Sequence, residues 1–531
     1  MVRVHFPYIC RMQDIFGFSE SLSWWVWVII AVLLIATRDI LQRKHTITHN
    51  FPVIGHLRYM AEKIGPEIRQ YFIANNREEL PFNRKERSWI YASSKSENNY
   101  QGFGSDQDFY GTNYHFLKPD LWPFRMPEGH VNITNPDFLP CAKVMGLANG
   151  RKRPFRPRSI LNISAMSFGS LSATAVESLN RGAFKAGAYH NTGEGGLSPY
   201  HSNGADVVFQ FGTAYFGVRS KEGNLDLDKL EKLVENNPFV RAIEIKLSQG
   251  AKPGKVGVLP GAKITAEIAA IRGVEMGVDV ISPASHRCFE TMDELLNLIE
   301  EIANRTGLPV GIKSAVGKTH LWHDLADQMV IRETGPDFIT IDGGEGGTGA
   351  APPSFADHMS LPFFNGFSII YKIFQDRKLT NRIVFVASGK LGLPANAARA
   401  LAMGADVINV AREAMMSIGC IQAQLCHTNK CPSGVATQSK WLQAGIDPTL
   451  KSERLFHYLQ YFKKELIALV HASGYEHPCQ YKMSDIETTT NDQNQMRTMD
   501  ETYGYDKTEV EFSSITDLAD CPHLGGVMKL K

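Results

Sequence analysis

The sequence has few cysteines, no excess of either charge and only one long apolar run. Eight cysteines in 531 residues are too few for a disulfide scaffold. Lysine and arginine number 56 against 55 for aspartate and glutamate, so the net charge of +1 gives no electrostatic case for nucleic-acid binding by the whole chain. No G-x-G-x-x-G follows the first predicted strand, so no Rossmann dinucleotide domain is predicted. The 45 glycines have no fixed period, which excludes collagen, and they gather in clusters that are typical of ligand-binding loops.

The single apolar run lies near the amino terminus. Residues 21–37 carry no charge, and as a helix they would extend about 25 Å, which is at the short end for crossing a bilayer. The run predicts a single-pass membrane anchor within residues 1–44, and a buried or interfacial helix is the alternative. Arg38, Arg43 and Lys44 follow the run, so we expect the rest of the chain on the cytoplasmic side of the membrane.

From residue 158 onward, short runs rich in Ile and Val alternate with helical stretches, which predicts parallel βαβ units. Eight such runs favour an α/β fold of the (β/α)8 TIM-barrel type over an open doubly wound sheet. We expect a cap or linker over 45–154, the barrel over 155–440 and a C-terminal helical and loop extension over 441–531 that packs on the barrel. The last forty residues have the character of loop. The predicted strands are 158–166, 188–194, 240–248, 278–285, 308–315, 336–344, 382–390 and 405–412.

Functional residues of such barrels lie at the carboxyl ends of the strands, and the unusual residues of this sequence fall there. Ser388, Gly389 and Lys390 follow the seventh predicted strand, and Ala411 and Arg412 follow the eighth, where a phosphate is often bound. The glycine run 343–350 lets backbone approach a ring or a phosphate, and the Lys313 ammonium could stabilise a reduced flavin. Together these residues predict a planar cofactor that carries a phosphate.

Three cysteines follow the last predicted strand with the spacing C-x5-C-x4-C. Cys420, Cys426 and Cys431 are suited to an iron–sulfur cluster, because thiolates are its natural ligands. A zinc site completed by His427 and a set of inert core cysteines remain as alternatives.

Several motifs resemble the synthase domain of the glutamate synthase family. They are NISAMSFGSLS, NTGEGG, EIKLSQGAKPG, DGGEGGTGAAP and, most specifically, GCIQAQLCHTNKCPSGVATQ (419–438). The chain is similar to the shorter, stand-alone, membrane-anchored form of that family. The resemblance implies FMN and a cluster, most simply [3Fe-4S], on Cys420, Cys426 and Cys431. It implies that Glu194, Lys246 and Gln249 face the substrate, and that FMN contacts Ala165, Met166, Ser167, Gln210, Lys313, Gly344, Gly347, Ser388 and Gly389.

The resemblance also implies a reaction of the type that acts on CH–NH2 donors. Electrons would pass from an external donor, ferredoxin-like or membrane-associated, through the cluster to FMN, and from there to 2-iminoglutarate or a similar imino or 2-oxo acid. Lys246 would bind a carboxylate and Glu194 would donate a proton. The chain opens MVRVHFPYIC, without the N-terminal cysteine of a glutaminase domain, so we expect ammonia from solution or from a partner. The family's basic residues are replaced at Phe209 and Tyr215.

Two functions of other classes fit the same sequence. One is a non-redox or nucleotide-dehydrogenase type of barrel enzyme with a catalytic cysteine in the segment 420–431. The other is an assembly subunit that keeps the fold without turnover.

Overall fold

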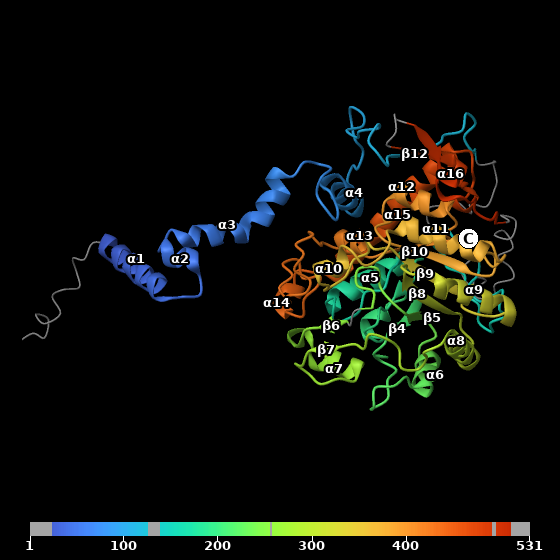
Figure 1. Ribbon diagram of the computed structural model, residues 1–531, viewed down its shortest axis with the longest axis horizontal. Coiled ribbons are helices and arrows are strands. Elements are labelled where there is room, and N and C mark those ends of the chain that lie inside the picture. The colour runs from blue at the N-terminus through green and yellow to red at the C-terminus, as the bar shows by residue number, and fades with distance from the viewer. Residues whose placement is uncertain (1–23, 126–138, 255–256, 491–494, 511–531) are drawn as a thin grey trace, which may run out of the picture. The chain divides into compact units, whose positions relative to one another are not determined.

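The computed structural model of the chain describes residues 24–125, 139–254, 257–490 and 495–510 (Figure 1). The chain forms two compact units, Met1–Lys85 and Glu86–Lys531. The domain boundaries predicted at residues 44, 154 and 440 stay predictions.

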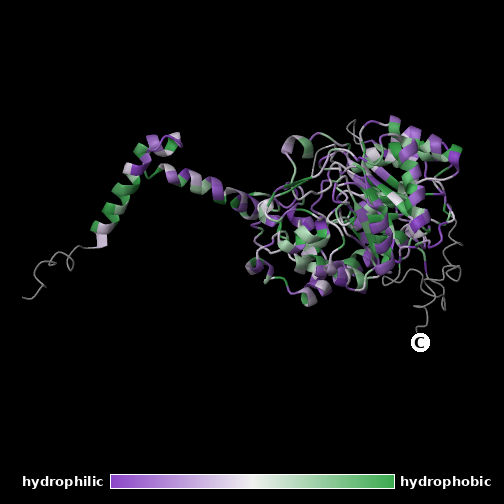
Figure 2. Ribbon diagram, turned by 90° about the horizontal axis from the view of Figure 1, so that it is seen from below, coloured by the Kyte–Doolittle hydropathy of each residue, from purple (hydrophilic) through white to green (hydrophobic). Residues whose placement is uncertain are grey.

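The first unit consists of helices. They are α1 (Trp24–Leu41), α2 (Thr46–Asn50), α3 (Gly55–Ile68) and a π-helical turn, η1 (Arg69–Ile73). By length and composition, α1 could cross a membrane, and it is the only such helix in the described part of the chain. Most of its length is hydrophobic (Figure 2). Residues 21–23 of the predicted helix lie outside the described residues.

The carboxyl end of α1 is fixed by a buried carboxylate. Asp39 accepts hydrogen bonds at 2.9 Å from the backbone N–H of Val53 and from Nε2 of His56. A charge buried in this way is stable only when it is paired and hydrogen-bonded. The contact therefore joins the end of α1 to the start of α3.

Eight parallel strands of the second unit close into a barrel, so the predicted TIM-barrel fold is confirmed. The strands are almost entirely buried, as the helices that cover a parallel barrel require, although several of them carry polar residues such as Asn162, His190 and Glu244. In order around the barrel they are β2 (Leu161–Ile163), β3 (His190–Asn191), β4 (Val207–Phe211), β5 (Val240–Lys246), β8 (Val310–Ala315), β9 (Phe338–Asp342), β10 (Val384–Ser388) and β11 (Val407–Val410).

One predicted barrel strand is wrong and one real strand was missed, so the total of eight is correct through two compensating errors. Residues 278–285 contain only β7 (Val280–Ile281), which pairs antiparallel with β6 (Val258–Leu259) outside the barrel. Ile281 is 63% exposed, whereas a barrel strand is covered on both sides. The missing strand is β4, which pairs with β3 and β5. A short β-branched run looks the same in a surface hairpin and in a buried strand.

Helices cover the barrel on the outside. They are α5 (Ala173–Lys185), α6 (Leu227–Asn236), α7 (Ala266–Arg272), α8 (Met292–Thr306), α9 (His320–Arg332), α10 (Pro353–Ala356), α11 (Phe363–Gln375), α12 (Pro394–Ala402) and α13 (Arg412–Ser417). The segment between β5 and β8 is the longest excursion from the barrel. It contains β6, the turn η3 (Gly261–Lys263), α7, β7 and α8.

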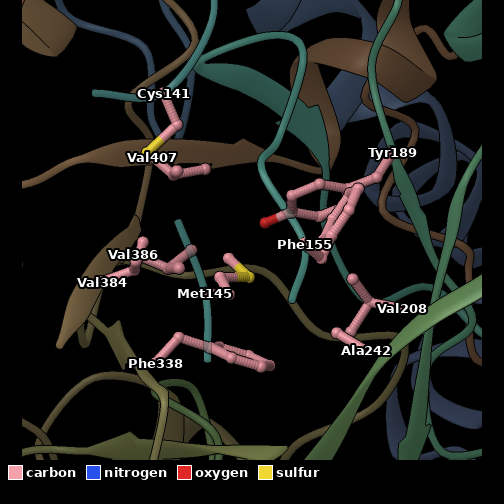
Figure 3. Close-up of a cluster of buried hydrophobic side chains, with 10 residues drawn as sticks. All are labelled: Cys141, Met145, Phe155, Tyr189, Val208, Ala242, Phe338, Val384, Val386 and Val407. Atoms are coloured by element: carbon pink, nitrogen blue, oxygen red, sulfur yellow. The ribbon is translucent and has the colours of Figure 1, made fainter. Parts of the chain in front are cut away.

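The amino end of the barrel is filled by a hydrophobic cluster (Figure 3). Phe338, Val384 and Val407 are the first residues of β9, β10 and β11. They meet Cys141, Met145 and other buried side chains of the preceding segment, which is itself held by an antiparallel bridge between Met145 and Phe155. Because this end is closed by packing, the carboxyl end is where a ligand site can form.

The C-terminal region contacts the outer helices of the barrel. The long helix α15 (Pro448–Ala472) lies against α5 and α12 and buries Leu455, Tyr458 and Phe462. Two short elements form within the last forty residues, which were expected to be mostly loop: β13 (Met496–Thr498) and α16 (Met499–Tyr503). The strand β13 pairs with β12 (Ile486–Thr489), which also pairs with β1 (His115–Leu117) from the predicted cap. The remaining helices are α4 (Arg84–Ser94) and α14 (Lys440–Gln443), and residues 511–531 lie outside the described part.

Candidate active site

Three side chains predicted to face the substrate form one hydrogen-bonded chain at the carboxyl end of the barrel. The ammonium of Lys246, the last residue of β5, lies 2.7 Å from Oε1 of Glu194 and donates to Oε1 of Gln249 at 3.2 Å. Nε2 of Gln249 donates in turn to the carbonyl oxygen of Gly347 at 2.8 Å. The structure therefore brings Glu194, Lys246 and Gln249 together and connects them to the glycine run after β9.

The same three side chains line a small cleft that opens to solvent. A second lysine, Lys252, also lines the cleft and donates to the carbonyl oxygen of Ala350 at 2.9 Å. The other lining residues include Thr213, Ser282, Pro283 and Ala284. With two ammonium groups against one carboxylate, the cleft attracts a negatively charged ligand.

Charge interactions in the cleft keep Glu194 ionised. Burial alone would raise the pKa of Glu194, but the ammonium of Lys246 outweighs that effect and the pKa is lowered overall. Burial and the like charge of Lys246 lower the pKa of Lys252. An ionised Glu194 can accept a proton, and the implied role of Glu194 as a proton donor stays a prediction.

A second buried ion pair lies beside the first. The ammonium of Lys313, on β8, is 3.3 Å from Oδ2 of Asp342, the last residue of β9. The same carboxylate oxygen accepts the backbone N–H of Gly250 at 3.0 Å, so Asp342 also binds a loop amide. Burial would lower the pKa of Lys313, but Asp342 and Glu244 raise it overall. Lys313 is therefore a fixed cation at the carboxyl end of the barrel.

The predicted phosphate and ring contacts lie on the loops after β9, β10 and β11. The N–H of Gly343 donates to the carbonyl oxygen of Ser388 at 2.8 Å, and Gly389 has a φ of 143°, a value that favours glycine. Arg412 donates to the carbonyl oxygen of Glu345, and its side chain passes so close to Gly347 that a Cβ there would lie 2.8 Å from it. The loops of Ser388, Gly389, Gly347 and Arg412 are therefore neighbours.

Lys390 and Ala411 have less direct roles in this arrangement. Lys390 forms an ion pair with Glu86 at 3.0 Å, so its charge is already balanced by the protein. Ala411 precedes α13 and can offer only its backbone.

The predicted flavin contacts after β2 are packed against those after β3. A Cβ at Gly193 would lie 2.7 Å from the backbone nitrogen of Ser167, so only glycine allows this approach of the two loops. Arg272, from α7, donates to the carbonyl oxygen of Phe168 at 3.0 Å and reaches Oγ of Ser167 at 3.4 Å. The segment Ala165, Met166 and Ser167 is thereby held at the carboxyl end of β2. Gly344 lies in the neighbouring glycine run, where its N–H donates to Leu361.

Gln210 lies inside the barrel rather than at its edge. It is 1% exposed and its amide donates to the carboxylate of Glu244 on β5. Glu244 also accepts from Asn191 at 2.7 Å and from Thr340 at 2.5 Å. Gln210 therefore belongs to a buried polar network beneath the site.

Phe209 and Tyr215, which stand where the family has basic residues, do not face the cleft. Phe209 and Tyr215 are fully buried, and neither is among the residues that line it. The hydroxyl oxygen of Tyr215 accepts the N–H of Arg287 at 2.9 Å and that of Cys288 at 3.3 Å. Tyr215 thus holds the loop that continues from the outer wall of the cleft.

The three cysteines after α13 lie near one another. Burial raises the pKa of Cys420 to about 12, and the neighbouring thiols of Cys426 and Cys431 contribute to the increase. No three His, Cys, Asp or Glu side chains of the described residues are placed to hold a single metal ion. The zinc alternative with His427 stays a prediction. An iron–sulfur cluster binds each thiolate to a different iron atom. Its cysteine sulfurs therefore lie farther apart than the ligands of a single metal ion.

Sequence reasoning missed three charged residues around the site. Lys252, Lys263 and Arg272 all lie in the long segment between β5 and β8. Only Lys252 had a signal, because it stands three residues after Gln249 in the motif EIKLSQGAKPG. The other two approach the site through tertiary folding and leave no local pattern.

The closed parallel barrel with charged side chains and glycine loops at its carboxyl end defines a (β/α)8-barrel enzyme. A family model described as the conserved region in glutamate synthase matches residues 135–476. The chain is also 37% identical over 488 residues to the glutamate synthase large subunit-like protein YerD of Bacillus subtilis. The aligned residues cover 86% of this chain and 92% of that protein. The chain therefore belongs to the glutamate synthase family, and it is an oxidoreductase of that type.

Other similarities cover less of the relatives. An archaeal glutamate synthase (NADPH) of Methanocaldococcus jannaschii is 34% identical over 318 residues, which span 59% of this chain and 58% of that protein. Among solved structures, mandelate oxidase with benzoyl-formic acid aligns with a TM-score of 0.38 and 14% identity, over 68% of this chain and 83% of that chain. The barrel assignment rests on the strand pairing of this protein and not on that alignment.

Proposed function

We propose that the protein is an FMN- and iron–sulfur-dependent oxidoreductase that reduces an imino or 2-oxo acid of the 2-iminoglutarate type to an amino acid. The observation that carries the proposal is the cleft in which Lys246, Glu194 and Lys252 meet, beside the fixed cation Lys313. Membership of the glutamate synthase family supports the same reaction class.

The residues at the carboxyl end of the barrel fit FMN. Lys313 has three N–H donors and one ion-pair partner, Asp342, among the described residues, so it has donors left for a flavin carbonyl. The glycine run and the loop of Ser388 and Gly389 offer backbone without side chains in the way. When bound, FMN would supply hydride transfer to carbon. Arg412 and the backbone near Ala411 would hold its phosphate.

The charge pattern of the cleft supports an acid with more than one carboxylate. Lys246 and Lys252 can each accept one carboxylate, and Gln249 can orient the ligand by hydrogen bonding. Lys252 thereby supplies a cation that Phe209 and Tyr215 do not. A dicarboxylate such as 2-iminoglutarate fits this arrangement better than a neutral substrate.

The ion pair of Lys246 and Glu194 can handle the proton that reduction of an imine requires. Lys246 has a proton to give at the position where it meets the substrate, and the Glu194 carboxylate at 2.7 Å stabilises the ammonium and orients it. Lys246 is thus the proton donor to the substrate nitrogen, and it takes its next proton from water in the open cleft.

The cysteine segment supports an iron–sulfur cluster on Cys420, Cys426 and Cys431. The cluster would supply one-electron transfer from an external donor, either ferredoxin-like or membrane-associated. The hydrophobic helix α1 supports a single-pass anchor with the barrel on the cytoplasmic side. Ammonia would come from solution or from a partner.

The test is anaerobic reduction of the purified, pigmented protein, followed by reoxidation with 2-oxo acids in the presence and absence of ammonia. We expect a flavin spectrum that is bleached by reductant and restored by a dicarboxylic 2-oxo acid only with ammonia. The variant Lys246→Met should bind FMN and fail to reoxidise. A protein without flavin, or one that no oxo or imino acid reoxidises, would contradict the proposal.

A further inference from the structure

Lys263 is a buried cation that lacks a carboxylate partner. Its side chain belongs to the turn η3 and is 2% exposed. No aspartate or glutamate in the described ranges forms an ion pair with it, whereas Lys246 and Lys313 each have one. Burying an ammonium is costly unless other groups compensate for the lost water. A lysine therefore occupies a position where burying an uncharged residue would cost less free energy.

The groups that do face Lys263 belong to two functional loops. Its Nζ donates to the carbonyl oxygen of Ser170 at 2.9 Å, in the loop that continues from Ser167. On the other side lie Cys426 and Cys431, which as thiolates would attract the ammonium, and Arg272, which repels it.

Neighbouring hydrogen bonds fix this arrangement. The side chain of Asn429, between Cys426 and Cys431, donates to the carbonyl oxygen of Ala262 at 3.0 Å. Gln438, after the cysteines, donates to the carbonyl oxygens of Gly169 at 3.1 Å and Leu171 at 2.9 Å. The turn that carries Lys263 is therefore clamped between the cysteine segment and the loop after β2.

We propose that Lys263 is the counter-charge of the iron–sulfur cluster and the positioning residue that holds the cysteine segment against the flavin-binding loop. The inference rests on the proposed cluster. Each thiolate that binds iron adds negative charge next to the ammonium, and this removes the imbalance that the buried cation otherwise leaves. A cluster bound there would supply one-electron transfer, and the Lys263 ammonium would stabilise the negative charge that reduction by a one-electron donor adds.

The experiment is a mediated reductive titration of the full chain with dithionite, followed by electron paramagnetic resonance, together with iron and flavin analysis. The variants are Lys263→Met, which keeps the length without charge, and Lys263→Arg, which keeps the charge. Lys430→Met is the matched control, because Lys430 is adjacent to Cys431 in sequence and is exposed. Solvent screens its charge, so its removal should have a much smaller effect.

We expect Lys263→Met to keep its flavin and to have a lower midpoint potential for the cluster. A tenfold loss in the equilibrium constant for one-electron reduction corresponds to about 59 mV. Lys263→Arg should stay near the wild-type value. If Lys263→Met does not retain iron and Lys263→Arg does, the requirement for charge is still supported.

Two results would overturn the inference in distinguishable ways. The electrostatic role of Lys263 would be contradicted if the iron-loaded Lys263→Met variant had an unchanged midpoint potential for the cluster. It would also be contradicted if Lys263→Met and Lys263→Arg lost iron equally. If the wild-type protein binds flavin but never contains iron, the proposed cluster itself is contradicted.

Discussion

Asp342 binds both the ammonium of Lys313 and the backbone N–H of Gly250 through a single carboxylate oxygen, at 3.3 Å and 3.0 Å. The aspartate ends β9, the lysine lies on β8 and the glycine belongs to the long excursion after β5. One carboxylate thus sets the position of a cation at the cofactor site and the start of the loop that forms the cleft.

Removal of the Asp342 carboxylate should lower the free energy of unfolding. The variant Asp342→Asn leaves the Lys313 ammonium buried without its ion-pair partner, and breaking a buried pair costs about 3–5 kcal/mol. Unfolding in urea should show a loss of this order, together with less bound FMN. The control is Asp376→Asn, whose partner Lys372 is exposed, and which should cost no more than about 1 kcal/mol. Equal losses in the two variants would contradict the role of Asp342.

The ion pair of Glu194 and Lys246 predicts a pH dependence. The pKa of Glu194 is lowered from 4.5, so the pair contributes stability above that pH and the contribution is lost as the pH falls through the lowered value. Relative to Glu194→Gln, the wild type should be more stable by about 1–3 kcal/mol at pH 7, and the difference should narrow below about pH 4.5. Urea unfolding at several pH values measures this. A difference that grows toward acid would mean that Glu194 is protonated in the folded protein.

Lys252 should discriminate between substrates with one and two carboxylates. The variant Lys252→Met removes one of the two cleft ammonium groups, and a hydrogen bond to a charged group is worth about 1.5–3 kcal/mol. We expect kcat/KM for a dicarboxylic substrate to fall about tenfold or more, mostly through KM, while a monocarboxylic analogue changes little. Steady-state kinetics with the two substrates tests this, and Lys185→Met, remote from the cleft, is the control. An equal loss with both substrates would place Lys252 outside the carboxylate site.

The helix α1 should determine where the protein is found in the cell. Deletion of residues 1–37 keeps Asp39 and its contacts with Val53 and His56, so the rest of the first unit retains its anchor point. We expect the full chain in the membrane fraction, resistant to extraction by alkaline carbonate, and the deleted form in the soluble fraction with its flavin. Full-length protein that is soluble after lysis would contradict a spanning helix.

The fold could be predicted because the strand pattern of a buried parallel barrel is repeated many times along the chain. The confusion between 278–285 and β4 shows the limit of such a pattern. Val278, Val280 and Ile281 have the composition of a strand, yet the pairing that makes them a surface hairpin depends on Val258 and Leu259, about twenty residues away. Burial, which separates the two cases, is a property of the assembled molecule.

The candidate site could be predicted only where a residue follows a strand or lies in a recognised motif. Glu194, Lys246 and Gln249 met both conditions, and they are found on one cleft. Lys263 and Arg272 met neither, because their positions depend on how the excursion between β5 and β8 folds back. The ionisation of Glu194 could not be predicted from the sequence either, because it depends on the 2.7 Å contact between Glu194 and Lys246.

The hydrogen bond from Gln249 to the carbonyl oxygen of Gly347 joins two parts of the site. Gln249 helps to shape the cleft, while Gly347 belongs to the glycine run after β9. A displacement of that run would therefore be transmitted to Gln249 and would change the shape of the cleft.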